Sequence, residues 1–158
     1  MKVRTDFVTN SSSSSFILAF TDEDSIKSEL VCGFDGEDIN DFPIVFNDVM
    51  NAERLTKEQV IDKFYEELEW EASYDIYNSL CRRNPSFRES TDRWTWRETE
   101  EAKKLIKEYI DNLVTSIKTK LDESSIFVEV EYSDHEYSNL EHEILPEHPC
   151  CVVRFSHH

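Results

Sequence analysis

The sequence predicts an α+β domain in which a four-stranded sheet, contributed by the two chain ends, is covered by two long antiparallel helices plus shorter helices. Apolar residues alternate with period two near both termini, and they recur every three or four residues in the middle. Two glycines and four prolines in 158 residues leave few tight turns. With 39% hydrophobic residues, the chain (residues 1–158) is expected to form one domain with a sizeable core.

The N-terminal segment predicts a hairpin. Residues 2–8 alternate in character, and residues 16–20 (FILAF) form the continuous apolar run of a buried strand. The residues between them are small and polar and compete for their own backbone hydrogen bonds, which predicts a loop. Besides a plain solvated loop, its serines allow an anion-binding turn or a modification site: Ser11, Ser12, Ser13, Ser14 and Ser15.

Shorter helices should follow. The acids of residues 21–24 can cap the start of a helix that ends near Val31, because carboxylates are stabilised at the positive N-terminal end of the helix dipole. Residues 32–41 contain both glycines and predict a loop. Pro43 can then begin another helix that ends near Glu53.

Two capping boxes should begin the two long helices, Thr56-Lys57-Glu58-Gln59 and Thr95-Trp96-Arg97-Glu98. The apolar stripe after the first consists of Ile61, Phe64, Tyr65, Leu68, Ala72, Ile76 and Leu80. The stripe after the second consists of Ala102, Leu105, Ile106, Tyr109, Ile110, Leu113, Ile117 and Leu121. Because a short turn at Asn84-Pro85-Ser86 joins them, the helices should pack antiparallel over one face of the sheet.

The C-terminal region predicts two more strands, at residues 126–132 and 150–155, around an acidic insert. Arg154 is expected to face Glu129 or Glu131 across the sheet. A helical insert would make these two strands parallel and would return the terminal histidines to the neighbourhood of Asp134. A simple antiparallel return would instead separate them by the length of a strand.

All five histidines lie in the last 24 positions, among carboxylates. Imidazole and carboxylate ligands suit zinc, manganese or iron, although the spacing matches no established metal motif. Exposed or locally hydrogen-bonded histidines are the simpler interpretation. A rigid site would be expected to join His135 or His142 to His157 or His158, with an acid from Asp134 or Glu141, because ligands on two packed elements are held best.

Both chain ends resemble one family. The opening TDFVTNSSSSSFI and an ending S-D…L-E-H…R-x-S-H-H, here Ser133-Asp134, Leu140-Glu141-His142 and Arg154-Phe155-Ser156-His157-His158, resemble those of an uncharacterised family of small bacterial and phage proteins. The resemblance covers little of the middle of the chain. That family has no established activity, so the resemblance implies no function. It does imply that the two terminal histidines belong to the protein.

The formal charge of −17 disfavours direct binding to nucleic acid or to an anionic membrane. The sequence contains neither a signal peptide nor an apolar run of about 18 residues, so a cytoplasmic location is expected. Residues 82–97 depart from the acidic composition. Their basic-aromatic patch is expected mainly to neutralise the acids of residues 58–75, with contact to phosphate or bases as the alternative: Arg82, Arg83, Arg88, Arg93, Trp94, Trp96 and Arg97.

Two interpretations of function follow. In the leading one, this is a soluble acidic interaction protein, accessory or inhibitory, that binds a basic protein partner through its carboxylates without a cofactor. In the alternative, it is a small metal-dependent hydrolase with a divalent metal such as zinc at the C-terminal cluster. The sequence decides neither whether the protein is an enzyme nor its oligomeric state.

Overall fold

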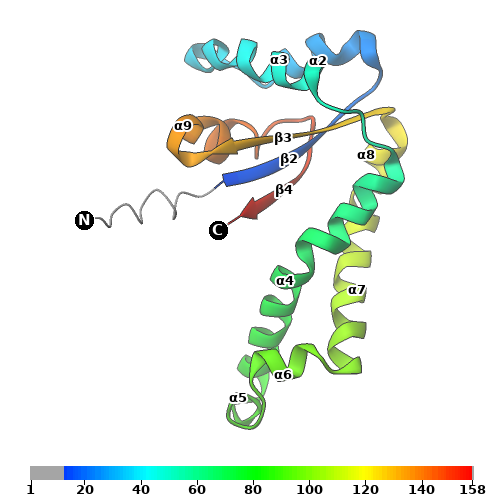
Figure 1. Ribbon diagram of the computed structural model, residues 1–158, viewed down its shortest axis with the longest axis vertical. Helices are drawn as coiled ribbons and strands as arrows, with labels where there is room; N and C mark the ends of the chain where they lie inside the picture. Colours follow the sequence, from blue (N-terminus) through cyan, green and yellow to red (C-terminus); the bar gives the residue numbers. More distant parts are fainter. Residues whose placement is uncertain (1–12, 158) are drawn as a thin grey trace, which may run out of the picture. The chain divides into compact units, whose positions relative to one another are not determined.

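The computed structural model describes residues 13–157 and shows a mixed α+β fold, as predicted (Figure 1). The described residues group into two compact units. We call residues 13–60 and 119–157 the sheet unit and residues 61–118 the helical unit. In the described residues, none of the helices combines the length and the apolar character that crossing a membrane requires.

The sheet has three strands in the order β3 (Ile126–Ser133), β2 (Ser13–Phe20) and β4 (Cys151–His157). The predicted number of four is therefore wrong for the described residues, and the strand predicted at residues 2–8 lies outside them. Both outer strands are antiparallel to β2, so they run parallel to each other. This is the arrangement expected for a helical insert between them.

The predicted loop is wrong for Ser13, Ser14 and Ser15, which belong to the central strand. Ser14 lies opposite Tyr132 of β3 and Ser156 of β4, so strands on both sides use the backbone groups that a loop would leave to solvent. Ser14 and Ser15 are buried, so a kinase could not reach their hydroxyl groups in the folded chain. Ser11 and Ser12 lie outside the described residues.

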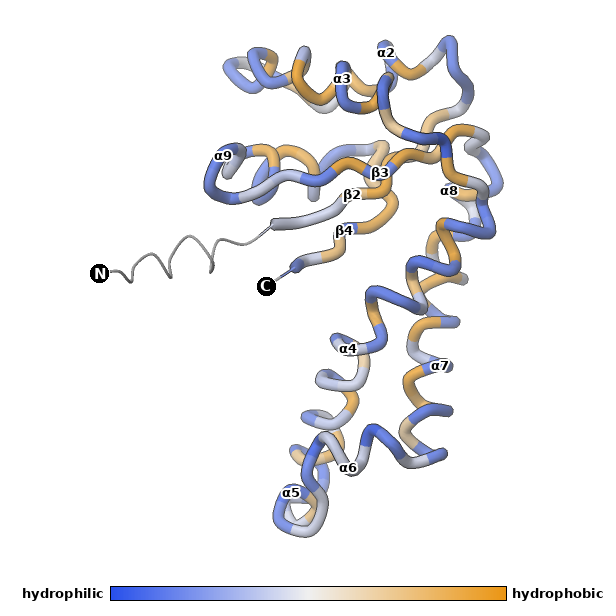
Figure 2. The backbone as a smooth tube through the Cα atoms, in the orientation of Figure 1, coloured by the Kyte–Doolittle hydropathy of each residue, from blue (hydrophilic) through white to orange (hydrophobic). Residues whose placement is uncertain are grey.

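One face of the sheet carries the core of the sheet unit. Phe16, Leu18 and Phe20 of β2 point to the same side as Val128 and Val130 of β3. Figure 2 shows the apolar character of β2 and β3. The elements packed on this core within the same unit are short helices, and they contribute Ile26, Leu30, Val45, Val49, Leu140, Ile144 and Leu145.

The predicted short helices are confirmed. Asp22 caps the 3-10 helix η1 (Glu23–Ser25) by accepting a 2.9 Å hydrogen bond from the Ser25 N–H, and α2 (Ile26–Val31) follows directly. The 3-10 helix η2 (Gly36–Asp41) occupies part of the predicted loop. α3 (Phe42–Asn51) has Pro43 in its first turn.

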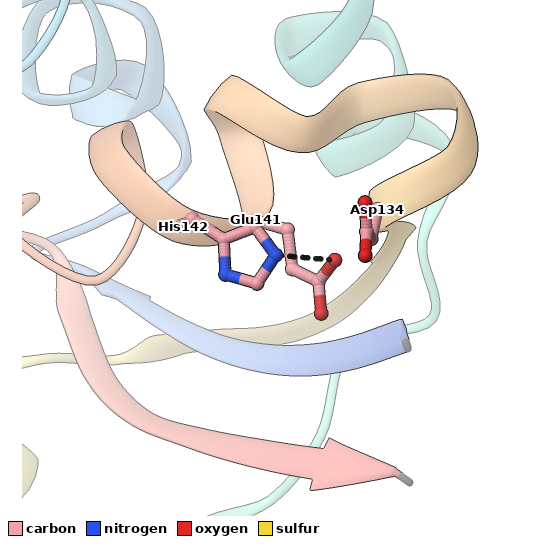
Figure 3. A group of neighbouring side chains, drawn as sticks. All are labelled: Asp134, Glu141 and His142. Carbon is pink, nitrogen blue, oxygen red and sulfur yellow. Dashed lines mark ion pairs between the residues drawn. The ribbon is translucent and has the colours of Figure 1, made fainter. Parts of the chain in front are cut away.

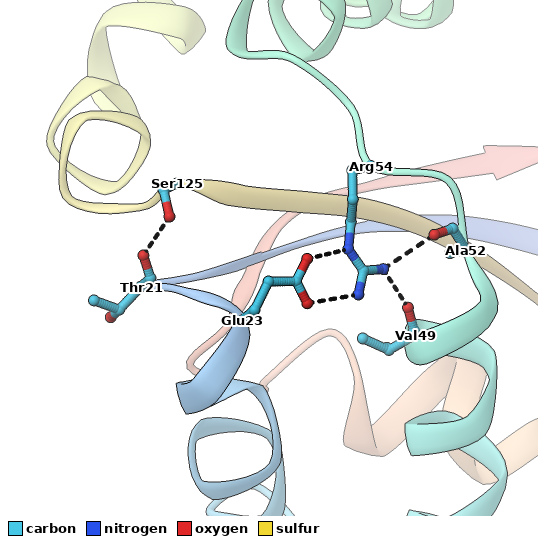
Figure 4. Close-up of polar contacts among 6 residues, drawn as sticks. All are labelled: Thr21, Glu23, Val49, Ala52, Arg54 and Ser125. Atoms are coloured by element: carbon cyan, nitrogen blue, oxygen red, sulfur yellow. Dashed lines mark hydrogen bonds and ion pairs between the residues drawn. The ribbon is translucent and has the colours of Figure 1, made fainter.

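Arg54 holds the end of α3 to η1 (Figure 4). Its guanidinium donates to both Glu23 oxygens, at 2.8 and 3.0 Å, and to the carbonyls of Val49 and Ala52, at 2.7 and 3.0 Å. The hydrogen bonds to Arg54 hold the pKa of Glu23 below its usual value. The arginine thus satisfies carbonyls at the C-terminal end of α3.

The helical unit contains most of α4 (Lys57–Arg83), then α5 (Pro85–Ser90), α6 (Arg93–Arg97) and α7 (Glu100–Ser116). Within this unit α4 and α7 run antiparallel, as predicted (Figure 1). Their buried residues include Phe64, Leu68, Ala72, Ala102, Ile106 and Ile110. α8 (Lys118–Glu123) then leads back to β3.

The two predicted capping boxes have different outcomes. In the first, Gln59 N–H donates to Thr56 Oγ1 at 3.1 Å and Thr56 N–H donates to Gln59 Oε1 at 2.8 Å, which confirms the start of α4. The second is wrong, because the Asp92 carboxylate accepts from the Thr95 N–H and hydroxyl, at 3.0 and 2.8 Å, and caps α6 instead. α7 is capped by Thr99, whose hydroxyl accepts from Ala102 N–H at 3.1 Å.

Candidate functional site

The candidate site is built on the insert between β3 and β4. α9 (Asp134–Asn139) follows β3 directly, with a kink at Tyr137 (φ −136°, ψ 52°). A single π-helical turn, η3 (Leu140–Ile144), comes next. π-helical turns recur at functional sites because the extra residue changes the direction of a side chain. Here Glu141 is completely buried, between the core residues Leu140 and Ile144.

Three side chains of this insert lie close enough to share one ion. Asp134, Glu141 and His142 each offer a ligand atom, and these atoms lie within 4.8 Å of one another. In Figure 3 Glu141 lies between the other two side chains, and His142 Nε2 is 3.4 Å from Glu141 Oε2. Asp134 and His142 are exposed, so this ligand group is open to solvent on one side.

Two residues of the sheet, Ser14 of β2 and Arg154 of β4, hold Glu141 in place. Ser14 Oγ donates to Glu141 Oε1 at 2.8 Å, and Arg154 Nε donates to the same serine oxygen at 3.0 Å. Arg154 Nη2 is also 3.6 Å from Glu141 Oε1 and so compensates part of the buried charge. These contacts fix Oε1, while Oε2 faces His142. We refer to Ser14, Glu141, His142 and Arg154 as the Glu141 network.

The predicted partners of Arg154 are wrong. β2 lies between β3 and β4, and Arg154 is opposite Phe16 on the core face of the sheet. It therefore reaches Glu141 instead of Glu129 or Glu131. Ser14 and Arg154 are not among the residues predicted for the metal site, because only the strand register brings them next to Glu141.

The remaining predicted histidines lie elsewhere. His157 Nε2 is 2.9 Å from Ser15 Oγ, which also donates to Glu131 Oε2 at 3.2 Å. Ser14 and Ser15 are consecutive strand residues and face opposite sides of the sheet, so His157 lies on the face away from Glu141. His135 is exposed on α9 and His158 lies outside the described residues.

His148 has a structural role. Its Nδ1 accepts from the Cys150 N–H at 2.9 Å, so its Nε2 carries the proton and donates to the Leu30 carbonyl at 2.7 Å. Burial lowers the pKa of this imidazole, which is therefore neutral at physiological pH. Burial also raises the pKa of both Cys150 and Cys151 to about 11, which keeps these thiols protonated.

A surface recess of about 280 Å³ is lined largely by residues of α9, the helix that also carries Asp134 of the ligand group. Two of its lining residues, Asp41 and Glu136, are acidic, and the others are Tyr137, Ser138, Asn139 and Leu140. Carboxylates on its wall disfavour an anionic ligand and favour a neutral or cationic one.

The basic-aromatic patch is divided in the structure. Arg97 contacts Glu69 at 3.4 Å, as expected for neutralisation of the α4 acids, and Trp96 is buried against Tyr77. Arg82, Arg83 and Arg88 are exposed, and the structure records no ion pair for them within residues 13–157. Trp70 and Tyr74, which are not among the predicted patch residues, also belong to the patch, because the Arg93 guanidinium lies 5.0 and 5.1 Å from their ring centroids. Their four-residue spacing in an acidic helix was the available signal.

The chain matches no protein-family model, and neither a curated protein nor a solved structure was found to be similar to it.

Proposed function

We propose that the protein binds a divalent metal ion between Asp134, Glu141 and His142 and that the ion serves hydrolysis. The observation that supports this proposal is the convergence of three ligand atoms within 4.8 Å. Two carboxylates and one imidazole suit zinc, manganese or iron. Three protein ligands leave coordination positions for water, and a bound ion would make that water a nucleophile near neutral pH.

The surrounding residues give each ligand a defined part. Glu141 is held by Ser14 and Arg154, at 2.8 and 3.6 Å, and such supporting contacts fix the orientation of a ligand before the metal arrives. Asp134 and His142 lie on the solvent side, where an ion and a substrate can enter. Because the recess lined by α9 carries the carboxylates of Asp41 and Glu136 and no basic side chain, we propose a neutral or cationic substrate with a hydrolysable amide or ester bond.

Metal titration of untagged, chelator-treated protein tests this function. Calorimetry with Zn²⁺ and Mn²⁺ should show one ion per chain. Asp134→Asn, Glu141→Gln and His142→Ala should each weaken binding by more than about 100-fold, because loss of a supporting contact alone weakens it about 10- to 100-fold. Circular dichroism would confirm that the variants fold. Asp134→Asn is the variant that should disturb the fold least, because it alters only an exposed side chain.

Neighbouring residues of the same type provide the controls. His135→Ala and Glu143→Gln change exposed side chains outside the ligand group and should bind the ion like the original protein. Equal affinity in Asp134→Asn and the original protein, or loss of binding in the His135 control, would contradict the proposed site.

A second candidate function is binding of a basic protein partner, and the distribution of charge favours it. The described part of the sheet unit contains 20 Asp/Glu against 5 Lys/Arg, whereas the helical unit contains 13 against 10. Three of those five bases, Arg54, Lys57 and Arg154, lie against carboxylates of the same unit. We therefore propose that the sheet unit supplies the acidic surface, which would also speed association electrostatically.

Matched neutralising variants would test that surface with protamine as a cationic probe. The sheet-unit variant replaces four exposed acids by their amides, at Asp24, Asp35, Glu37 and Glu53. The helical-unit variant does the same at Asp62, Glu66, Glu98 and Glu101. At low salt the sheet-unit variant should bind protamine about tenfold more weakly than the helical-unit variant does. Its binding should also depend less on salt concentration. Equal losses in both variants would contradict a localised surface.

A further inference from the structure

The end of the helical unit combines exposed aromatic rings with cationic side chains. Trp70 and Tyr74 of α4 stack with ring centroids 5.7 Å apart and an angle of 8° between their planes. They are 50% and 44% exposed, and Trp94 of α6 is 61% exposed. Large aromatic rings are seldom left this exposed without a partner, and a group of them marks a binding surface.

Arg93 joins the three rings into one surface. Its guanidinium carbon lies 5.0 Å from the centroid of Trp70, 5.1 Å from that of Tyr74 and 4.8 Å from that of Trp94. A cation–π contact holds a guanidinium in place without neutralising its charge or occupying its in-plane N–H donors. An arginine oriented in this way can still grip a phosphate group through two N–H groups.

Three more arginines extend the positive charge. Arg82 and Arg83 end α4 and Arg88 lies on α5, which packs on α4 through the Phe87–Tyr77 ring contact at 5.7 Å. All three are exposed, with no ion pair recorded for them among the described residues. Of the two acids in residues 82–97, Asp92 is occupied by capping α6. We call Trp70, Tyr74, Arg82, Arg83, Arg88, Arg93 and Trp94 the arginine–aromatic surface.

We propose that the arginine–aromatic surface binds single-stranded nucleic acid. Arginine donors fit the phosphates, and the exposed aromatic rings fit unpaired bases. In a duplex the bases are stacked on one another and are not available to these rings. The overall charge of −17 does not prevent this, because carboxylates farther than about 8 Å are largely screened at physiological salt. The sequence expectation against nucleic acid rests on that overall charge, whereas the arginine–aromatic surface brings together four arginines, Arg82, Arg83, Arg88 and Arg93.

Fluorescence anisotropy with labelled oligothymidylate and oligouridylate of about 20 nucleotides, longer than typical site sizes, tests the proposal. The full-length protein should bind at least one of them at about 50 mM salt and release it as salt rises. Trp94→Ala should weaken binding about tenfold, because one base loses its stacking partner. Arg82→Gln/Arg83→Gln should reduce the slope of log K against log salt by about 1.4, for two lost phosphate contacts.

The control and the competing partners are built into the same measurement. Lys103→Gln/Lys104→Gln removes two exposed charges from α7, outside the surface, and should leave affinity unchanged. No binding to either strand, binding that Trp94→Ala leaves intact, or equal binding to a duplex would overturn the proposal. Tighter binding to vesicles of anionic phospholipid than to either strand would overturn it in favour of a membrane surface. None of these variants alters the metal ligands, so the outcome is independent of the proposed hydrolase.

Discussion

Replacing Arg154 by methionine is expected to lower the free energy of unfolding by about 3 kcal/mol, because a buried carboxylate loses its cation. Glu141 is fully buried, and Arg154 reaches it both directly, at 3.6 Å, and through Ser14. Methionine retains most of the packing of the arginine stem, so the loss is mainly electrostatic. Urea denaturation in the presence of chelator measures the effect without any contribution from metal.

A double-mutant cycle separates charge from packing. In the Glu141→Gln background no carboxylate remains to be compensated, so Arg154→Met should cost at least about 1 kcal/mol less than in the original protein. Arg88→Met provides the matched control, since Arg88 is exposed and should change stability by no more than about 0.5 kcal/mol. An equal cost of Arg154→Met in both backgrounds would show that Glu141 does not depend on the arginine.

Elements that are fixed by contacts within one turn can be predicted from the sequence, and elements that depend on competing or distant contacts cannot. The start of α4 could be predicted because Thr56 and Gln59 cap each other within one turn. The predicted start of α7 at Thr95 is wrong because the Asp92 carboxylate accepts hydrogen bonds from Thr95 and caps α6 instead. The composition of Ser13–Ser15 predicts a loop because serine favours local hydrogen bonds, but pairing with β3 and β4, which are distant in sequence, overrides that preference.

The candidate site shows the same contrast. Asp134, Glu141 and His142 were recognisable as ligand types near one another in sequence. Nothing in the acidic insert distinguished the buried Glu141 from exposed neighbours such as Glu143, because the distinction comes from a π-helical turn. The position of Ser14 and Arg154 depends on the order β3-β2-β4, which alternation alone does not give.

Gly33→Ala is expected to destabilise the protein by about 1–3 kcal/mol through a steric clash in the sheet unit. A Cβ at this position would lie 2.0 Å from His148 Cδ2 and 2.4 Å from His148 Nε2. The imidazole cannot move aside without loss, because it is buried and hydrogen-bonded to Leu30 and Cys150. Gly33 does not have a positive φ, so alanine meets no backbone strain there. Thermal or urea unfolding gives the change in free energy.

The His148→Ala background shows whether the clash is the cause. Removing the imidazole leaves room for the new Cβ, so Gly33→Ala should become nearly neutral there, although His148→Ala itself is destabilising. Gly36→Ala is the control: Gly36 has φ +56° and a Cβ added to it would meet no atom within 4 Å, so its cost of about 1–2 kcal/mol comes from the backbone alone. That cost should be the same with or without His148. If Gly33→Ala were equally destabilising in both backgrounds, contact with the imidazole would not be why glycine is needed at this position.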